Sequence, residues 1–235
     1  MFELNPKYAY AFLTLPFLLV WFILFVFFKE TRKEQLWMSI LIAPLGPITE
    51  VLYFQDYWFP ASILSFTVGP FFILLEDFIF AFVMGGVGGV IYEVIFSKHL
   101  QKARKHANYT LGPPVIFVVA AIVTYLLFQL NTNSIFATVA GFVLAAILMV
   151  AQRKDLLVGS LLTGITITFV MFGGYLVLYN SISNAEELLS KGWLLYGTSL
   201  DMRVFNIPLT EMVWAFAWGM FVGPLYEFTK KRSFG

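Results

Sequence analysis

Long apolar segments alternate with short polar segments along the whole chain. Seven apolar runs can be separated, and they cover residues 8–28, 36–54, 71–96, 114–130, 135–151, 156–180 and 207–229. Each run is close to the roughly 17–25 residues that an α-helix needs to cross a bilayer. The pattern therefore predicts an all-α polytopic membrane protein with seven transmembrane helices.

Basic residues are distributed unevenly between the two sides that these seven helices define. With the N-terminus outside, the inner segments hold Lys29, Arg32, Lys33, Lys98, Lys102, Arg104, Lys105, Arg153, Lys154, Lys230, Lys231 and Arg232. Only Lys7, Lys191 and Arg203 remain on the outer side. Because inner loops are enriched in Lys and Arg, this split predicts a multi-pass cell-membrane protein with an external N-terminus and a cytoplasmic C-terminus.

The two outer loops, 55–70 and 181–206, are the long ones. Their bulky residues are Tyr57, Trp58, Phe59, Pro60, Trp193 and Tyr196. Aromatic side chains gather where a membrane meets water, so we expect these loops to form an aromatic belt and a lid at the outer surface.

The third and seventh apolar runs share one pattern. ILLEDFIFAFVMGGVGGVIYE at 73–93 aligns without a gap with IPLTEMVWAFAWGMFVGPLYE at 207–227, so that Asp77 falls on Glu211. Each segment has an acid near its start, an aromatic residue three positions later, a G-x-x-x-G and a final Tyr-Glu. We interpret this as a duplication that gives two parallel three-helix repeats. The predicted domains are residues 1–96 for the first repeat, 97–133 for a basic loop and connector helix, and 134–235 for the second repeat.

The aligned G-x-x-x-G segments, 85–89 and 219–223, predict close helix contacts. We expect the third and seventh helices to pack against each other there. Glu93 and Glu227 follow at the inner ends of the same two helices, beside basic residues. We interpret these two acids as interfacial and structural.

Composition supports a membrane protein and excludes several kinds of site. Hydrophobic residues make up 60% of the chain and charged residues 12%, against about 25% charged in a soluble domain. There is no cysteine, which excludes disulfides, thiol catalysis and cysteine-bound metals, and the two histidines, His99 and His106, lie in one basic loop. We expect no cofactor, no metal and no nucleic-acid partner. The sequence leaves open whether the chain forms a homo-oligomer.

Four acids are predicted at membrane depth in the outer half: Glu50, Glu76, Asp77 and Glu211. A charged side chain costs at least about 2.5 kcal/mol at the centre of a membrane helix, so such acids tend to be functional. We expect them to surround one cavity. Glu76 and Asp77 are consecutive and about 100° apart on a helix, so only one of them can face it. The simpler interpretation of Glu211 is a helix cap, because first-turn acids are stabilised by the helix dipole.

Aromatic residues follow two of these acids on the same helix face. Phe80 lies three residues after Asp77, Trp214 lies three residues after Glu211, and Trp218 lies one turn further on. A cation over an aromatic ring gains roughly 0.5–2 kcal/mol, so this pairing suits a cationic intermediate. The alternative is that these rings only fill the core.

These residues resemble the lycopene cyclase domain family, the integral-membrane carotenoid cyclases built from two repeats of about three helices. The family motif, Pro-x-Glu-Glu/Asp followed by aromatic residues, is similar to PLTEMVW at 208–214 and LLEDFIF at 74–80. Its acid-then-aromatic segment looks like TEVLYFQDYWFP at 49–60. Leu74 stands where the motif has proline, and Thr210 stands where it has its first acid.

The resemblance implies a carotenoid (lycopene) cyclase of the isomerase or intramolecular lyase type. Such an enzyme closes an end ring of a linear isoprenoid by acid-initiated, redox-neutral cyclisation. The implied catalytic residues are Glu50, Glu76, Asp77 and Glu211. The implied substrate-binding residues are Tyr53, Trp58, Phe80, Trp214 and Trp218. The implied partners are the lipid bilayer and a lipophilic carotenoid or other isoprenoid, whereas the ring type and the identity of the proton donor stay open.

The apolar runs also fit two other classes of seven-helix protein. A retinal protein needs a lysine in its last helix, and the seventh run contains none before Lys230. A transporter, an ion channel or a non-enzymatic isoprenoid-binding protein would also explain membrane acids. Against transport, the predicted repeats are parallel and the inner half of the helices holds ionisable groups only at its edge.

Overall fold

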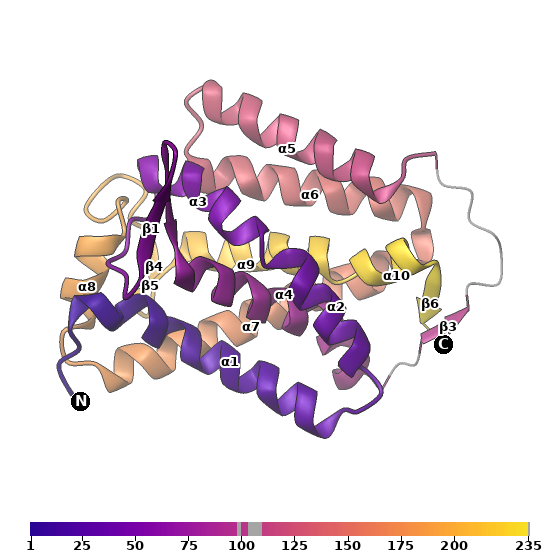
Figure 1. The fold of residues 1–235 in the computed structure, drawn as a ribbon, viewed down its shortest axis with the longest axis horizontal. Helices are drawn as coiled ribbons and strands as arrows, with labels where there is room; N and C mark the ends of the chain where they lie inside the picture. The colour runs from indigo at the N-terminus through magenta and orange to yellow at the C-terminus, as the bar shows by residue number, and fades with distance from the viewer. Residues whose placement is uncertain (98–99, 103–109, 235) are drawn as a thin grey trace.

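The computed structural model describes residues 1–97, 100–102 and 110–234, and it is mostly helical (Figure 1). The α-helices are α1 (Ala9–Phe27), α2 (Arg32–Ile42), α3 (Leu45–Asp56), α4 (Leu75–Ile95), α5 (Pro113–Gln129), α6 (Ser134–Gln152), α7 (Leu157–Ser181), α8 (Ala185–Gly192), α9 (Leu209–Val222) and α10 (Leu225–Lys230). Two short 3₁₀ helices, η1 (Pro6–Tyr8) and η2 (Lys154–Leu156), precede α1 and α7.

In the described part of the chain, three antiparallel strand pairs lie at the ends of the helices. The pairs are β1 (Ser65–Val68) with β2 (Phe71–Leu74), β3 (Leu100–Lys102) with β6 (Arg232–Phe234), and β4 (Arg203–Val204) with β5 (Ile207–Pro208). β1 and β2 form a hairpin directly before α4, and β4 and β5 directly precede α9. Short β pairs therefore stand before the two helices that were aligned in sequence.

Four helices in the described part of the chain are long and apolar enough to cross a membrane. They cover Pro6–Phe27, Leu75–Ile95, Ser134–Gln152 and Lys154–Ser181. A fifth span results if α2 and α3, which meet at a bend of 43°, are counted together. The predicted helical membrane class is confirmed in this coarser form, whereas seven spans remain a prediction because α5 and α9 are shorter than 18 residues.

Proline explains where two predicted helices are interrupted. The run 36–54 divides into α2 and α3 at Ala43 and Pro44, and the run 207–229 divides into α9 and α10 at Gly223 and Pro224. Proline has no N–H to donate to the preceding turn and its ring clashes with the helix backbone. Both predicted spans are therefore bent or broken where the sequence places a proline.

α4 lies in the centre of the bundle and is buried almost throughout its second half. Its glycines bring it close to α2, because a Cβ at Gly85 would lie 2.6 Å from Ile42 and a Cβ at Gly89 would lie 2.6 Å from Met38. In the second half of the chain, a Cβ at Gly219 would lie 2.7 Å from the Cα of Gly164 on α7. The expected close contacts are present, and the two G-x-x-x-G segments also meet each other, because a Cβ at Gly88 would lie 2.3 Å from Val222. The aligned glycines themselves face other helices: those of α4 face α2, and Gly219 faces α7.

The helices run roughly along the long axis of the molecule, so the connections gather at two ends (Figure 1). One end, here called the N end, holds the N-terminus, the β1–β2 hairpin and α8. The other end, here called the C end, holds the C-terminus, the β3–β6 pair and the connection between α1 and α2. The loops predicted to be external thus share one end, and described parts of the loops predicted to be internal share the other.

The two long loops at the N end interlock. The Phe59 amide donates to the Gly192 carbonyl at 2.7 Å, and the Leu194 amide donates to the Tyr57 carbonyl at 2.9 Å. Tyr57 and Trp193 are buried in a small hydrophobic cluster beneath these contacts. The prediction of an aromatic belt is therefore wrong for these two residues, which are core residues, because the loops fold back over the helix ends.

Candidate active site

A cavity of about 380 Å³ lies in the half of the bundle nearer the N end. Residues from α1, α3, α4, α5, α6, α7 and α9 line it, and most of them are apolar. Three carboxylates face it: Glu50, Asp77 and Glu211. The described residues form no salt bridge with any of the three. The cavity is therefore an apolar space with several acids and no charged partner for them.

Glu50 comes from the middle of α3 and is almost completely buried. One of its carboxylate oxygens has no solvent contact and no hydrogen-bond partner in the described part of the chain. A buried ionised carboxylate is costly unless donors surround it. This environment therefore favours a neutral, protonated Glu50.

Asp77 lies in the first turn of α4 and combines two roles. Its Oδ2 accepts the Leu74 amide at 3.3 Å, which caps the helix that carries it. Its Oδ1 is buried with no hydrogen-bond partner among the described residues. The hydroxyl of Tyr10 on α1 lies close to this carboxylate. One oxygen is thus structural, and the other is left for the cavity.

Glu211 lies at the equivalent position in the first turn of α9. It accepts a hydrogen bond from the hydroxyl of Tyr57, which also lies 3.3 Å from Thr210 Oγ1. The hydroxyl of Tyr175 on α7 is close to the same carboxylate. Unlike Glu50, Glu211 therefore has donors that can stabilise a negative charge.

The structure does not bring Glu76 to the cavity. Its carboxylate turns to the loop before the β1–β2 hairpin, where it accepts the Ser62 hydroxyl at 2.7 Å and the Ile63 amide at 2.6 Å. The angle of about 100° between successive helix residues separates it from Asp77, as expected. Asp77 is the member of the pair that faces the cavity, and Glu76 holds the loop to α4.

All five aromatic residues expected to bind substrate line the cavity: Tyr53, Trp58, Phe80, Trp214 and Trp218. The rings of Trp214 and Trp218 are stacked, with centroids 5.5 Å apart, and Phe80 lies 6.2 Å from Trp214. Trp214 Nε1 donates to the Tyr53 hydroxyl at 3.0 Å, which in turn donates to Thr138 at 2.8 Å. These hydrogen bonds hold the rings of Trp214 and Tyr53 in place beside the carboxylates.

Sequence reasoning missed three tyrosines of this site, Tyr10, Tyr57 and Tyr175. Each is buried, and each lies close to one of the carboxylates. Tyrosine is common near the ends of membrane helices, where it anchors the helix at the interface. No local signal therefore distinguished these three from anchoring tyrosines.

The cavity reaches an apolar surface between α3 and α5. Ile48 on α3 lines the cavity and is 63% exposed, and Ala121 on α5 lines it and is also exposed. Val118 and Ile122, next to this edge on α5, are exposed as well. The opening therefore lies on a face of the molecule that is apolar.

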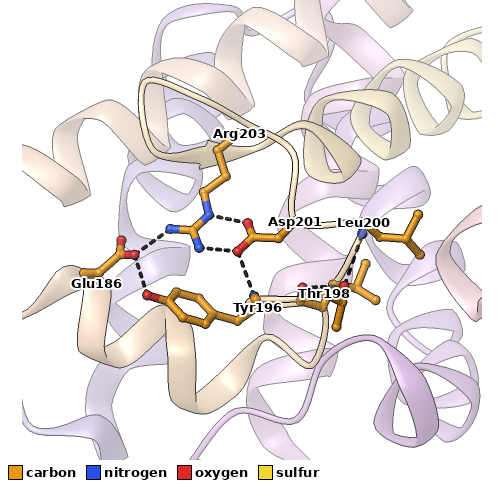
Figure 2. Close-up of polar contacts among 8 residues, drawn as sticks. Glu186, Tyr196, Thr198, Leu200, Asp201 and Arg203 are labelled. Atoms are coloured by element: carbon orange, nitrogen blue, oxygen red, sulfur yellow. Dashed lines mark hydrogen bonds and ion pairs between the residues drawn. The ribbon is translucent and has the colours of Figure 1, made fainter.

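A charged network covers the N end beside α9. Figure 2 shows the Arg203 guanidinium between two carboxylates, with its bonds to Asp201 at 2.5 Å and to Glu186 Oε1 at 2.6 Å. The Tyr196 hydroxyl donates to the same Glu186 oxygen at 2.8 Å, and the Gly197 amide donates to Asp201 at 2.8 Å. The network joins α8 to β4, which leads directly into α9 and Glu211.

The charges in this network stabilise one another. The Arg203 hydrogen bonds lower the pKa of Asp201. For Glu186, partial burial works in the opposite direction, but the bonds from Arg203 and Tyr196 leave its pKa lowered. The bonds with Asp201 raise the pKa of Arg203 further. All three groups are therefore ionised at neutral pH and hold the loop as an ionic clamp.

Comparison with known protein families matches part of the chain. Residues 133–229 match the family model described as lycopene cyclase. This range begins at the N-terminus of α6 and ends in α10, and it includes Glu211, Trp214 and Trp218. No curated protein and no solved structure matches the chain. Over residues 133–229, the chain is therefore similar to the lycopene cyclase family.

Proposed function

We propose that this protein is a carotenoid cyclase-like membrane enzyme that closes an end ring of a linear, lipophilic isoprenoid. The observation that carries the proposal is the convergence of Glu50, Asp77 and Glu211, from three different helices, on one apolar cavity with aromatic walls. The family match over the second half of the chain supports the same activity. The chemistry is acid-initiated and redox-neutral.

The hydrogen-bond partners suggest which carboxyl gives the proton. No described residue donates a hydrogen bond to the buried Oε2 of Glu50, so we assign Glu50 as the neutral acid. Glu211 accepts the Tyr57 hydroxyl, so we assign it as the carboxylate that acts as base. Asp77 supplies a second carboxylate at the cavity wall. Its Oδ2 caps α4, and its Oδ1 is left for the cavity.

The proposed reaction balances without any other reactant. The acid adds a proton to the terminal carbon–carbon double bond of the substrate, which leaves a cation on the neighbouring carbon. The next double bond attacks this cation and forms the ring carbon–carbon bond. The base then removes a proton beside the new cationic carbon, and a ring double bond forms. Substrate and product are isomers, and each cation lies beside the faces of Trp214, Trp218 or Phe80.

The cavity size suggests what part of the substrate enters. A volume of about 380 Å³ is near the lower end of the roughly 300–1,000 Å³ that is usual for small-molecule sites. It suits an end group and not a whole long isoprenoid. The opening between α3 and α5 lets the rest of the chain remain in the surrounding lipid, because Ile48 and Ala121 form an apolar edge there.

We also propose how the helices are arranged as membrane spans. We infer seven membrane spans, with α2 and α3 as one bent span and α9 and α10 as one broken span. The similar glycine contacts of α4 on α2 and of α9 on α7 support two parallel repeats. The loops with many basic residues favour an arrangement in which the C end is cytoplasmic.

Transport, the alternative function, is less well supported. A transporter would need a polar route from the cavity to the C end. Among the described residues, the core between the two is apolar and tightly closed, with Met84, Val87 and Val222 fully buried. A second alternative is a protein that binds an isoprenoid without converting it. The following experiment distinguishes this protein from an enzyme.

Expression in a lycopene-accumulating bacterium, followed by chromatography of the pigments, tests the proposal. We expect the wild-type chain to convert linear pigment into cyclic product. Glu50→Gln and Glu211→Gln should each lower cyclic product by about 100-fold or more, because general acid–base catalysis contributes about 10²–10⁴-fold. Both substitutions keep the side-chain shape and remove only the ionisable group.

Glu187→Gln is the matched control, since Glu187 is an exposed residue of α8 whose carboxylate pairs only with Lys191 in the described structure. It should leave the pigments unchanged, and immunoblots should show equal amounts of all variants. Linear pigment that persists with the wild-type chain would contradict the cyclase activity. Cyclic product at wild-type levels in both cavity variants would contradict the assigned roles.

A further inference from the structure

A second group of buried acids lies far from the cavity, towards the C end of the bundle. Glu34 comes from the first turn of α2, Glu93 from the last turns of α4, and Glu227 from α10. One carboxylate oxygen from each lies within 4.8 Å of the others. The side chains are 3%, 5% and 0% exposed. The expectation that Glu93 and Glu227 are interfacial is therefore wrong, because α2 and α10 close over them.

The hydrogen-bond partners of this group are incomplete. Both oxygens of Glu227, and one oxygen each of Glu34 and Glu93, are buried with no partner in the described part of the chain. A buried carboxylate normally accepts several hydrogen bonds or pairs with a cation. Glu227 is completely buried and points into the group, and neither of its oxygens accepts a hydrogen bond from another described residue, so the group offers oxygens to a positively charged ligand.

Helix packing prevents the three acids from moving apart. A Cβ at Gly89 would lie 2.6 Å from Met38, which fixes α4 on α2 one turn from Glu93. A Cβ at Gly88 would lie 2.3 Å from Val222, which fixes α4 on the end of α9, just before α10. These close contacts keep the helices together. Repulsion between the carboxylates therefore cannot move the helices apart.

Nearby arginines offset only part of the charge. Arg153 lies near Glu227, but its guanidinium also donates to Asp155 at 2.6 Å and to the Arg232 carbonyl at 2.7 Å. Three converging carboxylates attract a compact cation more strongly than a guanidinium already engaged with another acid. A divalent cation would neutralise the negative charge that remains.

We propose that Glu34, Glu93 and Glu227 form a divalent cation site that joins α2, α4 and α10. Carboxylate oxygens without histidine or cysteine suit hard cations such as Ca²⁺, Mg²⁺ or Mn²⁺. The three oxygens lie within 4.8 Å of one another, so one ion can lie within about 2.8 Å of all of them. Ca²⁺ takes its oxygens at about 2.3–2.6 Å in flexible geometry, whereas Mg²⁺ demands a near-ideal octahedron at about 2.0–2.1 Å, so Ca²⁺ suits three acids from separate helices better.

The site acts as a structural clamp at the end opposite the cavity, and the inference does not depend on the cyclase activity. The test uses the purified full-length protein, stripped with a chelator and then titrated with Ca²⁺ alone. We expect equilibrium dialysis to show one Ca²⁺ per chain. At a hundredfold excess over Kd, the Tm should rise by about 5–10 °C, because a ligand bound only to the folded state stabilises it.

Substitutions of single acids test whether the ion binds at this cluster. Glu227→Gln and Glu34→Gln should each weaken Ca²⁺ binding by about 10-fold or more and reduce the Tm shift. Glu211→Gln, in the cavity, and Glu187→Gln, on the surface, should bind Ca²⁺ like the wild type. Failure of the wild-type chain to bind Ca²⁺ or to gain stability would overturn the proposal even if a variant does not fold. Loss of binding in Glu211→Gln alone would overturn it as well, because the ion would then sit in the cavity.

Discussion

At the scale of single residues, Gly219 shows how closely the helices must approach. A Cβ there would lie 2.7 Å from the Cα of Gly164 and 2.8 Å from the Thr163 carbonyl oxygen, which are backbone atoms that cannot rotate away. We expect Gly219→Ala to lower the free energy of unfolding by about 1–3 kcal/mol, since overpacking forces the backbones apart. Unfolding of the purified protein in mixed micelles, followed by circular dichroism, measures the change.

Gly173 offers the matched control on α7. A Cβ there meets no atom within 4 Å. Gly173→Ala should therefore leave the protein unchanged or more stable by up to about 1 kcal/mol, because alanine restricts the unfolded chain and favours a helix. An equal loss of stability in both variants would show that the α7–α9 contact is not the cause.

The residues of the site were predictable where a local rule applied to them. The spacing of three residues placed Phe80 beside Asp77 and Trp214 beside Glu211, and both rings line the cavity. The choice between Glu76 and Asp77 needed the rotation of α4, which neighbouring helices set. The prediction of an interfacial Tyr57 is wrong, because its contact with Glu211 joins positions 154 residues apart and leaves no pattern in the local sequence.

At the scale of elements, the segment from α8 to β4 is held by ionic bonds, so its stability should depend on pH. The pKa values of Glu186 and Asp201 are lowered in the folded protein. Their contribution is therefore complete above the ordinary carboxyl pKa of about 4 and is lost as the pH falls through the lowered values. Hydrogen exchange of residues 193–206 should accelerate as the pH falls below about 4, beyond the intrinsic change in rate.

Arg203→Gln removes the cation that both carboxylates share, so exchange in this segment should already be fast at pH 7 and depend little on acid. Lys191→Gln is the control, because it removes only an exposed pair with Glu187 on one face of α8. Such pairs contribute about 0.3–0.5 kcal/mol. Protection of the segment that persists in Arg203→Gln would show that packing of Trp193 and Leu195 holds it instead.

The helices themselves were largely predictable, and their interruptions only in part. Apolar runs located α1, α4, α5, α6 and α7 to within a few residues. The same runs hid the breaks at Pro44 and Pro224, because hydrophobicity continues across them although the hydrogen-bond ladder does not. The strands were not predicted, since β2 is apolar and merges with the run that becomes α4.

At the scale of the whole molecule, the distribution of basic residues predicts the orientation. Reporter fusions after Arg153 and after Arg232 should both be cytoplasmic, since both positions lie in short basic segments, 153–154 and 230–232. A fusion in the α8 loop, after Lys191, should be external. An external reporter at Arg232 would mean that α9 and α10 do not complete a seventh span.

The cavity and the acid cluster could not be derived as shapes from the sequence. The cavity depends on how far α5 stands from α3, and no pattern within either helix encodes that separation. The cluster of Glu34, Glu93 and Glu227 depends on the contact between α10 and α2, which brings together residues from three segments. Sequence periodicity indicates which face of a helix is apolar, but not which other helix covers it.

The opening between α3 and α5 has a kinetic consequence. If substrate reaches Glu50 and Glu211 past Ile48, the relevant concentration is the number of substrate molecules per lipid molecule and not the amount per volume of buffer. Diluting a proteoliposome suspension would leave the rate per enzyme unchanged, whereas adding unlabelled lipid to the same membranes would slow it. The substrate concentration at which this protein saturates is then a concentration in the bilayer.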